Sequence, residues 1–173
     1  LIESDDEMSV RIGGSLIEIP AVSLQSLDNR QAALVYVFQY LIGNTDWSLV
    51  TADLDDTCCH NVDLYDIDPR TFLVPFDFDL SGLVNPRYAR PDPSLRITRV
   101  RQRLYRGYCL PSGDLRSALG HIVAREAEIL GVIDDITALP EKDARSARRY
   151  IEDFFERASN EERLLREFER RCL

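Results

Sequence analysis

Lysine is almost absent from this chain: of its 21 basic residues only Lys142 is a lysine, and the others are arginines. The 30 acidic residues outnumber them and give a net charge of −9, which disfavours a nucleic-acid binder that relies on a broad basic surface. A site for anionic phosphate groups on so acidic a protein would need bound cations or a local group of arginines. The chain also lacks a run of about 18 apolar residues, so we expect no membrane span.

Cysteine is scarce as well, and its four positions are too scattered for a small disulfide scaffold. The run Cys58-Cys59-His60 lacks the Cys-x₂₋₄-Cys spacing of most zinc sites and is a weak zinc signal. Cysteines adjacent in the chain rarely form a disulfide with each other. If the protein is exported, we expect a bridge from Cys58 or Cys59 to Cys109; otherwise we expect buried thiols. The sequence leaves the compartment unknown.

The apolar periodicity predicts a mainly helical α+β fold in one domain. With 45% hydrophobic residues, the chain is long enough to bury a core. Residues 28–42 carry apolar side chains at helical spacing, between an N-cap at Asp28 or Asn29 and a stop at Gly43. Further helical segments with solvated charged faces are expected at 112–133, 141–158 and 160–173.

Alternating residues predict two β-hairpins. Residues 61–66 and 71–77 should pair around a turn at Asp68-Pro69, and residues 8–19 should form a shorter hairpin that turns at Gly13-Gly14. Glycine and three prolines make residues 81–94 irregular, whereas residues 95–108 could be helical or extended.

Polar residues gather at the open end of the longer predicted hairpin. Asp77 and Asp79 close an apolar strand, and a buried carboxylate is costly unless something pairs with it. Asn61 opens the partner strand, so it should lie near Asp77, and the loop that carries Asp46 can fold over the same end. Carboxylate and amide oxygens are the ligands that Mg²⁺ or Mn²⁺ prefers. We therefore expect a metal site there.

These motifs resemble the spore-coat CotH-type branch of atypical protein-kinase-like proteins, over roughly residues 30–110. The motifs are YLIGNTDWS, CCHN and VPFDFDLSGLVNPRYA. The resemblance implies that residues 1–173 are one kinase-like C-terminal lobe, with the N-terminal lobe absent or truncated before Leu1, and that the hairpin carries the metal-site residues.

The same resemblance implies phosphoryl transfer from ATP to a protein hydroxyl, with Mg²⁺ or Mn²⁺ as cofactor. Asp46 would be the catalytic base. Asn61 and Asp77 would bind the metal and, through it, ATP. Asp79 would be a co-ligand or a second candidate for the metal-binding aspartate, because Gly82 follows it.

Two other functions remain open. Kinase loops place the asparagine five residues after the aspartate, whereas Asp46 and Asn61 lie fifteen apart, and residues 1–27 contain no lysine to clamp ATP. A non-catalytic pseudokinase or binding scaffold is therefore an alternative. A haloacid-dehalogenase-like phosphatase, with Asp77 as nucleophile and Asp79 as acid, ranks lower because its later lysine and acidic motif would come in the wrong order.

Arginines are concentrated in residues 96–106, which contain five of them. Such a group could bind phosphate. The alternative, which we favour from the sequence, is that these arginines pair with the acidic helices.

Overall fold

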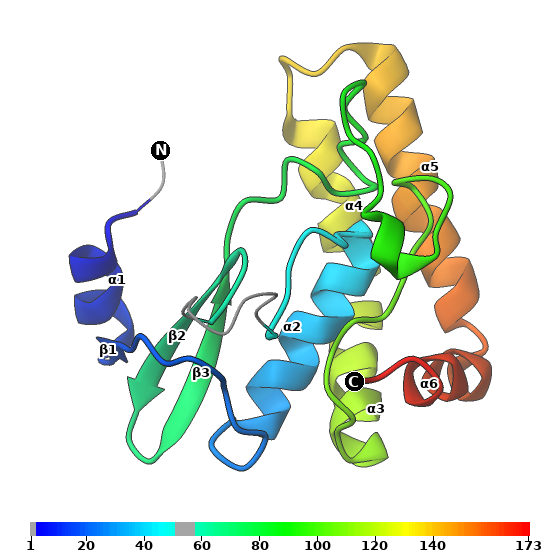
Figure 1. The fold of residues 1–173 in the computed structure, drawn as a ribbon. Coiled ribbons are helices and arrows are strands. Elements are labelled where there is room, and N and C mark those ends of the chain that lie inside the picture. The colour runs from blue at the N-terminus through cyan, green and yellow to red at the C-terminus, as the bar shows by residue number, and fades with distance from the viewer. Residues whose placement is uncertain (1–2, 51–57) are drawn as a thin grey trace.

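The structure is a computed structural model that describes residues 3–50 and 58–173. These residues form six α-helices, one short 3-10 helix and a three-stranded antiparallel sheet (Figure 1), which confirms the α+β class. The helices are α1 (Asp5–Ile12), α2 (Asn29–Ile42), η1 (Pro93–Leu95), α3 (Ser112–Val123), α4 (Glu126–Asp135), α5 (Glu141–Ala158) and α6 (Glu161–Glu169). The strands are β1 (Ser15–Leu16), β2 (Val62–Ile67) and β3 (Arg70–Pro75).

The predicted hairpin of β2 and β3 is confirmed. Val62 pairs with Pro75 at its open end and Ile67 with Arg70 beside the two-residue turn. Leu64 and Leu73 are opposite each other in the register, so their side chains lie on the same face of the sheet, and both are buried in the core. β1 pairs with β2 on the other edge, so β2 is the central strand.

The shorter hairpin predicted at residues 8–19 is wrong, because the first half of that segment is helical. Ser4 accepts a hydrogen bond from the Glu7 N–H while the Glu7 side chain accepts from the Ser4 N–H, and this capping box starts α1. Gly13 ends the helix at φ +68°, a left-handed conformation that glycine adopts without steric cost. Only β1 is extended, and it pairs with β2 instead.

Helix α2 is the central element, lying between the sheet and the C-terminal helices (Figure 1). Asp28 caps its first turn by accepting from the Gln31 N–H, and Gly43 ends it at φ +62°, as predicted. The Gln31 side chain also bonds both backbone groups of Leu73, donating to its carbonyl at 2.7 Å and accepting from its N–H at 3.0 Å. This contact ties α2 to β3 and so fixes the hairpin against the helix.

Two helices replace the single periodic segment expected at 112–133. The chain turns at Ala124 and Arg125, between α3 and α4. α3 packs against α2 and α6, whereas α4 packs against α5, so the turn lets each apolar face reach its own neighbour. Helices α5 and α6 agree with their predicted segments. No helix in the described part of the chain combines the length and the apolar character that crossing a bilayer requires.

The disulfide predicted between Cys58 or Cys59 and Cys109 is wrong. Cys109 bonds Cys172, and Cys58 bonds its neighbour Cys59. A backbone hydrogen bond lies beside the Cys109–Cys172 disulfide: the Leu173 N–H donates to the Gly107 carbonyl at 3.0 Å. The end of α6 is thereby fastened to the segment before α3, which is neither helix nor strand. Because all four cysteines are disulfide-bonded, Cys58 and Cys59 are not available as zinc ligands.

Candidate functional site

The Asp46 loop follows the end of α2 directly. Oδ1 of the buried Asn44 side chain accepts a hydrogen bond from the Asp46 N–H at 2.9 Å, and this bond closes a tight turn. Arg106 donates to the Thr45 carbonyl, one residue before Asp46. Burial lowers the pKa of Arg106, and the nearby charges of Asp92 and Asp46 partly offset that effect. The loop thus presents the Asp46 carboxylate, 35% exposed, in one orientation.

Asn61 contacts Asp46 although fifteen residues separate them. Its side-chain amide donates to the Asp46 carbonyl at 2.7 Å and to Oδ2 at 3.2 Å. Backbone hydrogen bonds between Ser48 and His60, both 3.0 Å, bring the two ends of the intervening loop together. His60 Nε2 also lies 3.2 Å from Asp46 Oδ1. The fifteen-residue spacing implies an acidic insertion at residues 49–58 relative to a kinase loop, and residues 51–57 of it lie outside the described residues.

Asp77 and Asp79 follow the end of β3. The Phe76 N–H donates to the Asn61 carbonyl at 3.1 Å, so Asn61 and Asp77 lie at the same end of the hairpin, as predicted. Both have left-handed backbones, φ +54° for Asn61 and +49° for Asp77, a conformation in which Asn and Asp are enriched among non-glycine residues. Such backbones occur often at functional sites.

The expectation that Asp77 and Asp79 end a buried strand is wrong. β3 stops at Pro75 and both aspartates are exposed, so no burial cost demands a partner for them. The Asp79 N–H lies 3.4 Å from Asp77 Oδ1, and the Tyr88 hydroxyl donates to Asp79 Oδ2 at 3.0 Å. That hydrogen bond raises the pKa of Tyr88. Asp79 is therefore engaged by the loop that follows it.

The donor set fits a divalent cation only if asparagine takes part. Among residues 3–50 and 58–173, no three His, Cys, Asp or Glu side chains are grouped so as to hold a metal ion. The side-chain NH₂ group of Asn61 points at Asp46, which leaves the side-chain oxygen of Asn61, Oδ1, available as a ligand. Mg²⁺ commonly keeps several waters and takes one or two carboxylates. A carboxylate from Asp46 or Asp77, together with Oδ1 of Asn61, would supply the protein ligands of such a site.

Two glycines hold the Asp46 loop beside the segment that follows Asp79. The Gly82 N–H donates to the Gly43 carbonyl at 3.0 Å, and the Leu83 N–H donates to the Ile42 carbonyl at 2.9 Å. A Cβ atom at either glycine would overlap the Tyr150 hydroxyl, which lies against both. From the sequence, Gly82 was considered only as a break in regular structure and as the glycine that follows Asp79. No sequence signal indicated Tyr150, because it belongs to α5.

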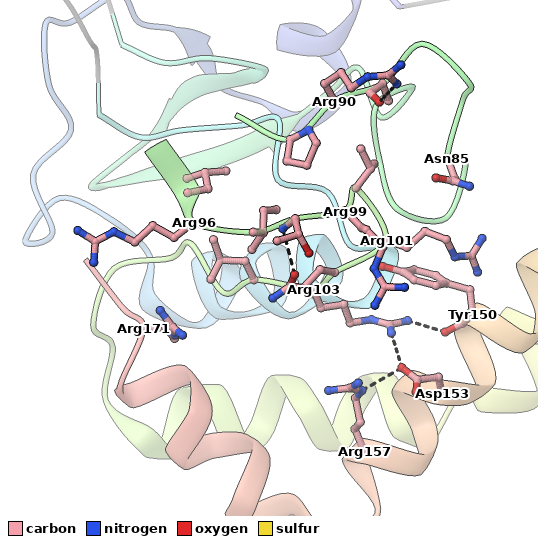
Figure 2. Close-up of a pocket in the computed structure, with 18 of the residues that line it drawn as sticks. Asn85, Arg90, Arg96, Arg99, Arg101, Arg103, Tyr150, Asp153, Arg157 and Arg171 are labelled. Atoms are coloured by element: carbon pink, nitrogen blue, oxygen red, sulfur yellow. Dashed lines mark hydrogen bonds and ion pairs between the residues drawn. The ribbon is translucent and has the colours of Figure 1, made fainter. Parts of the chain in front are cut away.

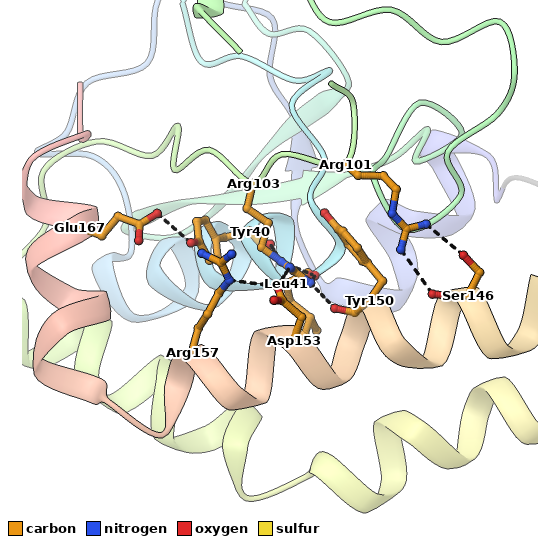
Figure 3. A network of polar contacts seen from close by, with 9 residues as sticks. All are labelled: Tyr40, Leu41, Arg101, Arg103, Ser146, Tyr150, Asp153, Arg157 and Glu167. Atoms are coloured by element: carbon orange, nitrogen blue, oxygen red, sulfur yellow. Dashed lines mark hydrogen bonds and ion pairs between the residues drawn. The ribbon is translucent and has the colours of Figure 1, made fainter. Parts of the chain in front are cut away.

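Arg103 contacts the end of α2, from which the Asp46 loop begins (Figure 3). Its guanidinium donates to the carbonyls of Tyr40 and Leu41 in the last turn of α2, and it forms an ion pair with Asp153 at 2.6 Å. Burial lowers the pKa of Arg103, while Tyr150 and Asp153 oppose that shift. The predicted pairing of an arginine with an acidic helix holds here, and its consequence is to fix the start of the Asp46 loop.

Comparison of the chain with protein-family models, with curated proteins and with solved structures finds no match in any of the three. Function must therefore be argued from the motifs and from the contacts described above.

Proposed function

We propose that the open end of the β2–β3 hairpin binds Mg²⁺ or Mn²⁺ together with the phosphates of ATP, and that the protein transfers the terminal phosphoryl group to a protein hydroxyl. One observation carries the proposal: Asn61 donates to both the carbonyl and the carboxylate of Asp46. That contact joins the expected metal ligand to the expected base.

Each residue has a role that its contacts support. Asp46 accepts the proton of the attacking hydroxyl; the bond from Asn61 holds its carboxylate, and the bond from its N–H to Asn44 fixes its backbone. Asn61 and Asp77 hold the cation, which supplies positive charge against the phosphates. Asp79 anchors the following loop through Tyr88 and is close enough to Asp77 in the chain to act as a co-ligand.

A non-catalytic binding scaffold is the second candidate. Residues 3–27 form α1 and β1 and contain no lysine, and Lys142 is exposed at the start of α5. The described residues therefore lack the lysine with which protein kinases clamp ATP. A phosphatase of the haloacid-dehalogenase type fits less well, because β1, β2 and β3 pair antiparallel.

The test is thermal unfolding with and without MnCl₂ and ATP. We expect Mn²⁺ to raise the melting temperature of the parent protein by several degrees, since a ligand at about 100 times its Kd adds about 2.7 kcal/mol. Asp77→Asn should abolish the rise. Asp66→Asn removes an exposed carboxylate from the opposite end of the hairpin and should keep it.

Phosphoryl transfer is then assayed with labelled ATP on the same three proteins and on Asp46→Asn, and the Mn²⁺ response of Asp46→Asn is measured as well. Transfer that Asp46→Asn abolishes while the Mn²⁺ response survives supports the kinase function. A Mn²⁺ response without transfer supports the scaffold. An equal response of the parent, Asp77→Asn and Asp66→Asn proteins would rule out the site.

A further inference from the structure

A large cavity lined by arginines lies between residues 85–104 and helices α5 and α6 (Figure 2). Its volume is about 1220 Å³. Ten arginines line it, against two acidic residues, Asp153 and Glu167. Since the whole chain has a net charge of −9, this cavity is a local reversal of the protein's charge.

Four of these arginines are held by the fold. Arg103 and Arg157 both bond Asp153, at 2.6 and 2.9 Å. Arg101 donates to the Ser146 hydroxyl and carbonyl and lies over the Tyr150 ring. Arg90 donates to carbonyls of its own loop. These arginines form the wall of the cavity.

The other six have no side-chain hydrogen bond or ion pair with any described residue, and all six are exposed. They are Arg87, Arg96, Arg99, Arg149, Arg170 and Arg171. The pairing with acidic helices that we favoured from the sequence therefore does not hold for Arg96 and Arg99. Several unpaired guanidinium groups around one cavity repel each other and attract anions. Arginine also binds carboxylate and phosphate through two parallel hydrogen bonds.

The arginines come from separate parts of the chain and are spread along the cavity. Arg96 and Arg171 lie toward one end of it in Figure 2, and Arg101 lies toward the other, beside Tyr150. The Cys109–Cys172 disulfide holds Arg171 in this position. Aliphatic side chains of Leu95, Ile97 and Leu104 lie among the arginines. The lining thus combines spaced cations with apolar surface.

We propose that this cavity binds an extended peptide segment that carries several carboxylate or phosphate groups. The spaced arginines match charges distributed along a chain, and the aliphatic residues suit the methylene groups between them. The volume exceeds the range of about 300–1,000 Å³ that is usual for small-molecule pockets. A nucleic acid fits less well, because its backbone charge continues beyond the cavity while the chain as a whole carries a net charge of −9. The proposal does not depend on the metal site.

Fluorescence anisotropy with labelled eight-residue peptides tests it. The probes are an all-glutamate peptide, a peptide with alternating phosphoserine, and an all-glutamine peptide. We expect both anionic peptides to bind and the glutamine peptide not to bind. The tighter of the two anionic peptides identifies whether carboxylate or phosphate is the preferred group.

A triple variant and a matched control locate the binding. Arg99→Gln, Arg149→Gln and Arg171→Gln together should weaken binding of the anionic peptides by at least about tenfold, because each removes a charged hydrogen-bond donor. The control combines Arg30→Gln, Arg163→Gln and Arg166→Gln, which are exposed arginines outside this cavity and carry the same change in net charge. It should bind as the parent does. Asp77→Asn should also bind normally, which separates this site from the proposed metal site.

The proposal is overturned if the triple variant and the control lose affinity equally, since binding would then follow net charge alone. It is also overturned if neither anionic peptide binds more tightly than the glutamine peptide. Tighter binding of tripolyphosphate or of a single-stranded oligonucleotide than of either peptide would reassign the cavity to that ligand.

Discussion

The end of the hairpin and the arginine cavity are opposite in charge and are held in different ways. At the hairpin end, Asn61 donates to the Asp46 carboxylate, and bonds to Asn44 and from Asn61 fix the Asp46 backbone. In the cavity, most of the arginines are exposed and have no described partner. A fixed side chain suits chemistry that needs one geometry. Exposed, adjustable side chains suit a ligand whose charges vary in position.

The two regions are neighbours rather than separate structures. Tyr88 bonds Asp79, and the adjacent residues Arg87 and Ala89 line the cavity. Tyr150 lines the cavity as well, while its hydroxyl lies against Gly43 and Gly82. Changes that displace Tyr150 should affect both regions, and changes elsewhere should separate them.

The largest effect is expected for Gly43→Ala. Its left-handed backbone and the overlap of a Cβ atom with the Tyr150 hydroxyl should together cost about 3–4 kcal/mol of unfolding free energy. Denaturant unfolding measures the loss, and the Mn²⁺ and peptide responses should weaken together. Gly113→Ala is the control, because nothing lies within 4 Å of a Cβ at that glycine. Equal stability of the two variants would contradict the close contact with Tyr150.

Removal of the Cys109–Cys172 disulfide should distinguish the regions. The bond closes a segment with a sequence separation of 63, and its loss through the pair Cys109→Ala and Cys172→Ala should cost about 2–4 kcal/mol. At a temperature where the variant remains folded, peptide binding should weaken, because Arg170 and Arg171 are no longer held beside the cavity. The Mn²⁺ response should persist. Loss of the Mn²⁺ response with unchanged peptide binding would contradict this assignment.

Alkaline pH should destabilise the core that both regions share. Burial raises the pKa of Tyr36, Tyr40 and Tyr105 above their ordinary value of about 10. Below that pH both the folded and unfolded states keep these protons and stability is complete. Above it the unfolded state loses its protons first, so stability falls as the pH rises.

The measurement is the unfolding free energy between pH 8 and pH 11. Tyr36→Phe removes one of the three groups and should reduce the loss at pH 11 by about 1 kcal/mol. Identical pH profiles of the parent and the variant would contradict the raised pKa of Tyr36 and so its burial in the folded protein.

The smallest effect is expected for Tyr88→Phe. The hydroxyl is exposed, so its bond to Asp79 should add little to stability, because water can replace it. If Asp79 is a metal co-ligand, releasing it should change the Mn²⁺ affinity about twofold to fivefold, within the range of single hydrogen bonds. Peptide binding should stay the same. A peptide effect larger than the Mn²⁺ effect would assign Tyr88 to the cavity.

Sequence reasoning succeeded where the signal was local. The cap at Asp28 and the stop at Gly43 bound α2 correctly, and the alternation around Asp68-Pro69 placed the β2–β3 hairpin. It failed at α1 although the signal was present, because the Ser4–Glu7 capping box outweighs the alternation that Gly13-Gly14 suggested. The Asp46–Asn61 contact was anticipated from the motif order, but the exposure of Asp77 was not, since the end of β3 depends on where pairing with β2 stops.

The sequence by itself determined which segments become helices and strands, because caps, turns and apolar periodicity act over a few neighbouring residues. It also determined that acidic and amide side chains meet at one end of the hairpin. Only the tertiary structure decided that arginines from residues 87–103, α5 and the end of α6 surround one cavity, and that Cys109 bonds Cys172. Those arrangements depend on how the helices pack, and packing joins residues that no local pattern relates.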